Sequence, residues 1–178
     1  MTTKMIFSGF GGQGVLTLGQ VVADIALARE KEVTWMPSYG AEMRGGTANC
    51  SVIISDNVIG SPIVLGDIDI LCALNGPSVT KFLDKVRSGG IIFINSSIVT
   101  EPVERDDVTI IAIDASNIAT ATGNPRGANM TMLAGFLTQT ELFTPEDIEA
   151  ALLRRFKGRQ ELVDMNMASI KKGLESLG

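Results

Sequence analysis

The stretch FSGFGGQGVLTLGQ, residues 7–20, places three glycines at the G-x-G-x-x-G spacing and continues into an apolar pattern. Residues 4–9 form a short apolar run, which predicts a buried strand ending in the first glycine. Apolar side chains recur at helical spacing over residues 13–29, so the glycines are predicted to turn a strand directly into a helix. A turn of this kind presents free backbone N–H groups at a helix start, which indicates a site for a phosphate, pyrophosphate or carboxylate.

Strand and helix patterns alternate along the rest of the chain. Further buried strands are predicted at residues 32–36, 49–55, 67–74, 91–97 and 108–114, with Pro37 ending the first of these. Helices are predicted at residues 75–86, 129–140, 144–156 and 161–177, with a turn at residues 88–90. The alternation predicts an α/β fold, a Rossmann-like three-layer arrangement with a mainly parallel sheet, in which residues 1–178 form a single domain.

The composition is that of an ordinary globular protein. Hydrophobic residues make up 45% of the 178 residues and charged residues 20%, which argues against disorder. The net charge is −5, and the basic residues alternate with acids, so no nucleic acid partner is expected. No apolar run approaches the roughly 20 residues of a membrane span, and residues 1–7 lack the layout of a signal peptide. We therefore expect a cytoplasmic protein without membrane attachment.

The residue types exclude several kinds of catalytic site. The chain has no histidine, so no Ser–His, Cys–His or histidine-ligated metal mechanism can be built within it. Its two cysteines, Cys50 and Cys72, are far apart and belong to no C-x-x-C pattern, which predicts neither zinc nor an iron–sulfur cluster in this chain alone. Both are expected to be buried free thiols.

A nicotinamide or flavin site requires more than the glycines. The Rossmann fingerprint includes an acid about 20 residues further on, at the end of the second strand, where it binds the ribose hydroxyls. The predicted second strand ends at Met36, and its only acid, Glu32, stands at the opposite end. Three interpretations stay open: a free-standing NAD- or FAD-binding protein, a module that binds an anionic metabolite, and glycines that serve packing alone. Packing alone does not account for Gly12 and Gln13.

A second segment, PSYGAEMRGGTANCSV at residues 37–52, is dense in polar and charged side chains between two predicted strands. Glu42 and Arg44 could simply pair with each other while the glycines turn the chain. A loop so rich in hydrogen-bonding groups, set beside strand ends, is also where α/β proteins place ligands. Arg44 has the fork of donors that binds a phosphate or carboxylate in a bidentate manner, provided that Glu42 does not neutralise it.

A third polar cluster, residues 123–129, precedes an apolar helix pattern. Asn129 either caps that helix or contacts a ligand, and its position is equally compatible with the two roles. Arg126 is the stronger binding candidate, because a cation just ahead of a helix start would strengthen a site for an anion.

Three segments together resemble the gamma subunit, or gamma domain, of 2-oxoacid:ferredoxin (acceptor) oxidoreductases. They are SGFGGQGVLTLGQVVADIA, PSYGAEMRGGTANCSVIIS and GNPRGANMTMLAGFL, at residues 8–26, 37–55 and 123–137. They stand in the order and at the spacing of that family, and the resemblance covers nearly the whole chain. The joint occurrence of G-x-G-G-Q-G with S-Y-G-x-E-x-R-G-G is far more specific than either pattern alone.

The resemblance implies a subunit that supports chemistry whose cofactors belong to its partners. Such enzymes use thiamine diphosphate to decarboxylate a 2-oxoacid, pass electrons through iron–sulfur clusters to ferredoxin, and release an acyl-CoA. The implied partners are alpha and beta subunits, with a delta subunit in some complexes, and ferredoxin reached through the complex. This chain alone is then expected to bind no cofactor and to be inactive. Its role would be to help close the CoA and substrate region.

The resemblance also implies which residues face that shared region. The glycine turn would face an anion or a partner, and the second segment would lie at the intersubunit site. With the third cluster, the expected site residues are Gly9, Gly11, Gly12, Gln13, Gly14, Ser38, Tyr39, Glu42, Arg44, Arg126 and Asn129.

Overall fold

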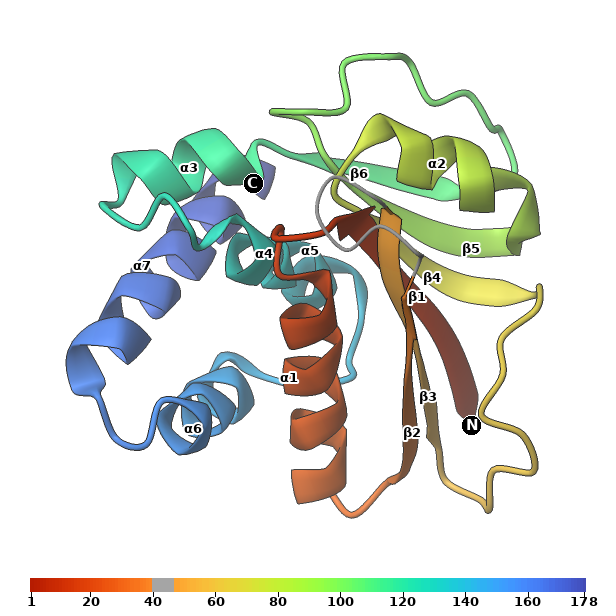
Figure 1. Ribbon diagram of the computed structural model, residues 1–178, viewed down its shortest axis with the longest axis horizontal. Helices are drawn as coiled ribbons and strands as arrows, with labels where there is room; N and C mark the ends of the chain where they lie inside the picture. The colour runs from red at the N-terminus through yellow and green to blue at the C-terminus, as the bar shows by residue number, and fades with distance from the viewer. Residues whose placement is uncertain (40–46) are drawn as a thin grey trace.

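A single six-stranded sheet forms the centre of the molecule (Figure 1). The computed structural model describes residues 1–39 and 47–178. In sheet order β2-β3-β1-β4-β5-β6, the strands are Glu32–Tyr39, Thr47–Ser55, Thr2–Phe10, Ile68–Ala73, Val86–Asn95 and Thr109–Ile113. The β1, β4, β5 and β6 strands are parallel, whereas β3 runs antiparallel to both of its neighbours. The predicted α/β fold with a mainly parallel sheet is confirmed.

Helices cover both faces of the sheet, with most of them on one face (Figure 1). The helices are α1 (Val15–Ala28), α2 (Gly76–Phe82), α3 (Ala115–Ala121), α4 (Ala128–Thr131), α5 (Leu133–Gln139), α6 (Pro145–Arg155) and α7 (Gln160–Leu177). A short 3-10 turn, Leu83–Lys85, follows α2. Alternate residues of β1 divide between two cores: Met5 and Phe7 pack toward α1 and the C-terminal helices, and Ile6 packs toward α2. This alternation is why a strand buried on both faces reads as a continuous apolar run.

Local signals account for the starts of two helices. Thr144 and Asp147 form a capping box at α6, in which each side chain accepts a hydrogen bond from the other's backbone N–H. At α2 the side chain of Asn75 accepts from the N–H of Ser78, and Pro77 lies in the first turn. These arrangements fix where the chain leaves β4 and where the C-terminal helices begin.

Three expectations about element bounds are wrong. Pro37 does not end β2, which continues to Tyr39, because an edge strand tolerates a residue without an N–H. Residues 88–90 lie inside β5, where Gly89 has φ +74° and the pairing with β4 shifts register. The helix predicted at residues 129–140 is two helices, α4 and α5, that meet at Met132.

Candidate functional site

The glycine turn lies at the carboxyl ends of β1 and β4. The α1 helix leaves β1 and packs against β1, β2 and β3. The α2 helix leaves β4 on the opposite face of the sheet. The chain therefore moves outward in opposite directions from two adjacent parallel strands, and such a switch point is where open α/β sheets bind their ligands.

The glycines of the turn are required for two different physical reasons. Gly12 and Gly14 have φ of +98° and +75°, in the left-handed region that glycine adopts without strain. Gly9 has no such φ, but a Cβ there would lie 2.7 Å from Oε1 of Gln13 and 2.8 Å from Cγ1 of Val15. Within the G-x-G-x-x-G pattern, Gly9 is thus required by a close approach and Gly14 by its backbone φ, whereas Gly12 is an additional glycine outside that pattern.

Gln13 joins the ends of the two strands. Its Oε1 accepts from the N–H of Phe10 at 2.6 Å and from Nδ2 of Asn75 at 3.3 Å, and its Nε2 donates to the carbonyl of Leu74 at 3.2 Å. Both ends of the amide are therefore engaged within the protein. Gln13 was predicted to lie in a turn that faces an anion or a partner, and its amide spans the crevice between β1 and β4.

Asn129 holds the start of α1 from the far end of the sequence. It is buried, and its Nδ2 donates to the carbonyl of Gly14 at 3.1 Å. Gly14 is the N-cap residue of α1 and supplies no side-chain cap. Asn129 does not cap α4, because it is the second residue of that helix, whose N-cap is Gly127. The first of its two predicted roles is therefore wrong, and the structure gives it the position of a support behind the glycine turn.

Contacts of Asn124 with Asn166 and with Gly127 hold the rest of the third cluster, residues 123–128, in place. Nδ2 of Asn124 donates to Oδ1 of Asn166 at 3.1 Å, and a Cβ at Gly127 would overlap the side chain of Asn124. Arg126 is exposed and lies between these two anchored residues. This cluster is brought to the glycine turn through Asn129, so the first and third segments of the sequence do meet.

The ends of β2 and β3 lie at the same edge of the sheet as the glycine turn. Tyr39 pairs with Ala48, and Thr47, the first residue of β3, pairs with Phe10 at the end of β1. Ser38 is exposed at this end of β2. Glu42 and Arg44 lie outside the described residues.

The position of β3 changes what the glycine turn can bind. In the dinucleotide-binding fold the second strand lies beside the first, and its terminal acid reaches the ribose. Here β3 lies between β1 and β2 and runs antiparallel to both. The residue paired with the end of β1 is Thr47, which has no carboxylate. The geometry therefore disfavours the NAD- or FAD-binding interpretation, as the missing acid does.

The two cysteines are buried free thiols, as expected. The Cys50 thiol donates to the carbonyl of Val15 at 3.7 Å, and burial raises its pKa to about 12. Burial raises the pKa of Cys72 as well. Since the thiolate is the nucleophile, neither residue is reactive at neutral pH.

The described ranges, 1–39 and 47–178, contain neither a metal-binding group of side chains nor a membrane-spanning helix. No group of His, Cys, Asp and Glu side chains there is placed to hold a metal ion. Among the helices of those ranges, none combines the length and apolar character needed to cross a bilayer.

Residues 4–176 match the model of the pyruvate ferredoxin/flavodoxin oxidoreductase family. The chain belongs to this family. The match covers all three segments that carried the resemblance, and it agrees with the strand order that disfavours a dinucleotide site.

Relatives within the family differ in length. The ketoisovalerate oxidoreductase subunit VorA of Methanothermobacter thermautotrophicus is 38% identical over 174 residues, which are 97% of this chain and 36% of the relative. The chain thus spans about a third of the length of that relative. The gamma subunit of a keto/oxoacid ferredoxin oxidoreductase from Geobacter sulfurreducens superposes with a TM-score of 0.82 and 29% identity, covering 98% of both chains.

A second solved structure shares the fold. It is the 2-oxoglutarate:ferredoxin oxidoreductase of Magnetococcus marinus with 2-oxoglutarate, coenzyme A and succinyl-CoA bound. Its TM-score is 0.87 at 24% identity, over 99% of this chain and 32% of the other. The same α/β unit therefore occurs both as a chain of its own and as part of a longer one.

Two residues that follow β4, Asn75 and Ser78, belong to this edge and were not among the predicted site residues. Asn75 caps α2 and donates to Gln13, and the Ser8 hydroxyl donates to that of Ser78 at 2.8 Å across the crevice. The Asn75-Gly76-Pro77 sequence is a recognisable helix start, so the cap could have been predicted. Its contact with Gln13 could not, because the two residues are 62 positions apart.

Proposed function

We propose that residues 1–178 form one gamma-type domain of a 2-oxoacid:ferredoxin oxidoreductase. In this proposal the assembled enzyme decarboxylates a 2-oxoacid with thiamine diphosphate, passes electrons through iron–sulfur clusters to ferredoxin, and forms an acyl-CoA. The observation that carries the proposal is the family match over residues 4–176. It is supported by relatives in which the same unit is either separate or joined to a longer chain.

The chemistry available to the chain supports a shared site. It has no histidine, and its two thiols are buried with raised pKa values. The proposal therefore assigns thiamine diphosphate and the iron–sulfur clusters to alpha and beta subunits, with a delta subunit where the complex has one. The contribution of this chain is the sheet edge that carries the glycine turn.

At that edge we propose that an anion binds at the N-terminus of α1. Gly14 leaves the first turn of this 14-residue helix without a side-chain cap, and the dipole of the helix favours negative charge there. Coenzyme A carries phosphates of the required kind. Arg44 and Arg126 are proposed as bidentate partners of that anion or of the substrate carboxylate, with Ser38, Tyr39 and Glu42 at the subunit boundary.

The choice of 2-oxoacid is assigned to the other subunits. The relatives are named for ketoisovalerate and for 2-oxoglutarate, although they share this unit. The shared unit suits a component common to these reactions, and coenzyme A is such a component.

The test is reconstitution with the companion subunits, followed by 2-oxoacid- and CoA-dependent reduction of a viologen dye. Gly12→Ala introduces a Cβ with no described atom within 4 Å, so its cost to folding is backbone strain alone. Gly158→Ala is the matched control, since Gly158 has φ +72° and the same open surroundings in the loop between α6 and α7. We expect Gly12→Ala to raise KM for CoA and Gly158→Ala to leave it unchanged. Equal KM values in both variants would remove the glycine turn from the CoA region.

A second measurement addresses the alternative class. The isolated chain is titrated with NAD(H), NADP(H) and FAD and followed by calorimetry. We expect no binding; micromolar affinity for any of them would favour a free-standing nucleotide-binding protein.

A further inference from the structure

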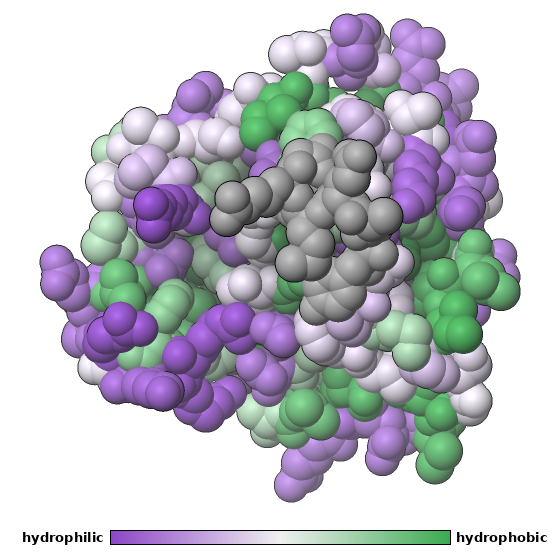
Figure 2. Space-filling view, in the orientation of Figure 1, coloured by the Kyte–Doolittle hydropathy of each residue, from purple (hydrophilic) through white to green (hydrophobic). Residues whose placement is uncertain are grey.

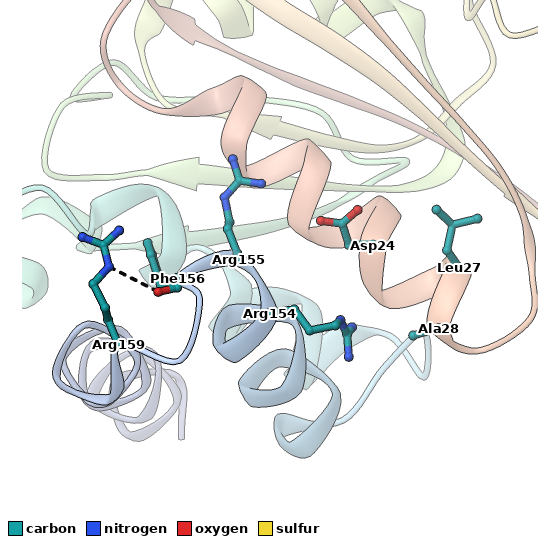
Figure 3. A pocket seen from close by; sticks show the side chains of 7 residues that line it. All are labelled: Asp24, Leu27, Ala28, Arg154, Arg155, Phe156 and Arg159. Atoms are coloured by element: carbon teal, nitrogen blue, oxygen red, sulfur yellow. Dashed lines mark hydrogen bonds between the residues drawn. The ribbon is translucent and has the colours of Figure 1, made fainter.

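A basic groove lies on the side of the molecule away from the glycine turn. It runs between the C-terminal half of α1 and the junction of α6 with α7, and its volume is about 840 Å³. Three arginines line it, Arg154, Arg155 and Arg159, and Asp24 is the only acid among the lining residues. In Figure 3, Arg154 and Arg155 extend from α6 on the side of α1, and Arg159 stands beside Phe156.

The guanidinium groups of this groove are not neutralised from within the described part of the chain. The ion pairs of that part involve other residues, although the chain as a whole carries a net charge of −5. Arg155 donates to Oε1 of Gln20 at 2.9 Å, and Arg159 donates to the carbonyl of Phe156 at 3.2 Å. Both partners are uncharged, so among the lining residues only Asp24 opposes the three guanidinium charges, and the groove keeps a net positive charge in an acidic protein.

Apolar side chains also line the groove. Leu27 is 56% exposed on α1, and Phe156 is half-buried at the end of α6. In Figure 2 the surface over α6 and the start of α7 mixes strongly hydrophilic and hydrophobic atoms. An occupant that matches this lining has several carboxylates and an apolar side chain between them. An amphipathic acidic segment of a polypeptide has that chemistry, whereas inorganic phosphate would leave Leu27 exposed to water.

We propose that this groove docks an acidic segment of a companion subunit, and this inference rests on the proposed function. Charge complementarity carries the choice of occupant, because arginine pairs with carboxylates in a bidentate manner at interfaces. The groove is an open surface between helices, as suits a polypeptide segment. The groove and the glycine turn lie at opposite ends of α1, because Leu27 is in the last turn of this helix and the glycine turn precedes its first turn. The groove would therefore be a second site of contact with the companion subunits, separate from the glycine turn.

The test uses the chain assembled with its companion subunits. The variant Arg154→Glu/Arg159→Glu reverses two groove charges and leaves the Arg155–Gln20 contact in place. The control Lys81→Glu/Lys171→Glu makes the same change in net charge at exposed lysines of α2 and α7. The dissociation constant of the assembly is measured for each at low and at high salt.

We expect the groove variant to weaken assembly roughly tenfold at low salt, with a smaller effect at high salt, and the control to stay within about twofold of the wild type. Equal weakening in both variants would show a general charge effect and overturn the proposal. Unchanged assembly of the groove variant would also overturn it, while activity of the complex would leave the proposed function intact. Failure of the wild-type chain to assemble at all would overturn both.

A second variant guards against misfolding as the cause. Arg154→Lys/Arg159→Lys keeps the charge and provides amines that a carbodiimide joins to carboxylates in contact. The proposal predicts an isopeptide cross-link from position 154 or 159 to an acidic residue of a companion subunit, identified by mass spectrometry. A complex that assembles without such a cross-link, or one whose cross-link is blocked by phosphate or CoA alone, contradicts the proposal.

Discussion

Replacing Gly14 by alanine tests how the glycine turn is built. The residue has φ +75°, and its new Cβ would overlap Nδ2 of Asn129 and lie 2.9 Å from Cγ of the same side chain. The left-handed backbone costs about 1 kcal/mol, and displacing Asn129 sacrifices a buried hydrogen bond of about 1 kcal/mol and its packing. We expect Gly14→Ala to lower the free energy of unfolding by about 3 kcal/mol.

Two comparisons separate these contributions. Gly12→Ala has the backbone cost alone, because no described atom lies within 4 Å of its Cβ, so it should cost about 1 kcal/mol. In an Asn129→Ala background the nearest contact of the new Cβ is relieved, since Cβ of residue 129 lies 3.5 Å away. Gly14→Ala should then cost only about 1 kcal/mol, which gives a coupling of about 2 kcal/mol between the two positions.

The assay is urea unfolding followed by far-UV circular dichroism and by the fluorescence of Trp35, the single tryptophan of the chain. Unchanged m-values across the four proteins of the cycle are the control for two-state behaviour. Equal costs of Gly14→Ala with and without Asn129, or equal costs of Gly14→Ala and Gly12→Ala, would refute the contact as the reason for glycine at this position.

Three further predictions concern single groups. Gln13→Ala removes three hydrogen bonds, two of which join the glycine turn to the end of β4, so it should cost about 2 kcal/mol in urea unfolding, and a cost under about 0.5 kcal/mol would contradict that bridging role. Asp56 pairs with Lys31 and with the terminal amino group, and these hydrogen bonds lower its pKa to about 2 from 3.8. Its folded pKa is depressed, so its contribution is complete above about pH 4 and is lost as the pH falls toward 2; Asp56→Asn should remove that part of the acid dependence, and an unchanged acid profile would count against the pairing. Cys50 and Cys72 should not react with a thiol-specific aromatic disulfide at pH 8 until urea unfolds the chain, whereas rapid labelling of the native protein would contradict their burial.

The sequence was sufficient to predict the α/β class and the glycine turn, because both depend on neighbouring residues. The strand before the glycines and the helix after them are each specified by a local period. The cap at Thr144 and the acids behind it specify the start of α6 in the same local way. Elements of this kind are predictable because the residues that specify them are close together in the sequence.

The order of the strands could not be predicted, because it depends on pairing between distant segments. The periodicity of residues 47–55 is the same whether β3 lies at an edge or between β1 and β2. The end of β2 at Pro37 was wrong for the same reason, since only an edge position makes a proline acceptable there. The α3 helix was missed because a seven-residue segment is too short to show a clear helical period.

The site was predictable in its residue types and not in its contacts. Asn129 was a candidate on its own segment, yet its partner is the carbonyl of Gly14, 115 positions away. Gln13 was predicted to lie in a turn that faces an anion or a partner, but the hydrogen bond from its amide to the carbonyl of Leu74 could not be predicted. Long-range packing determines which polar groups are satisfied internally and which remain open to a partner.

We propose that this chain is a required part of a 2-oxoacid:ferredoxin oxidoreductase, and omission of single subunits tests that requirement. The companion subunits are purified, loaded with thiamine diphosphate and iron–sulfur clusters, and assayed for 2-oxoacid- and CoA-dependent reduction of ferredoxin with and without this chain. We expect full activity to require the chain, and the chain alone to have none. Companion subunits that show the same kcat and the same KM for CoA in its absence would contradict this requirement.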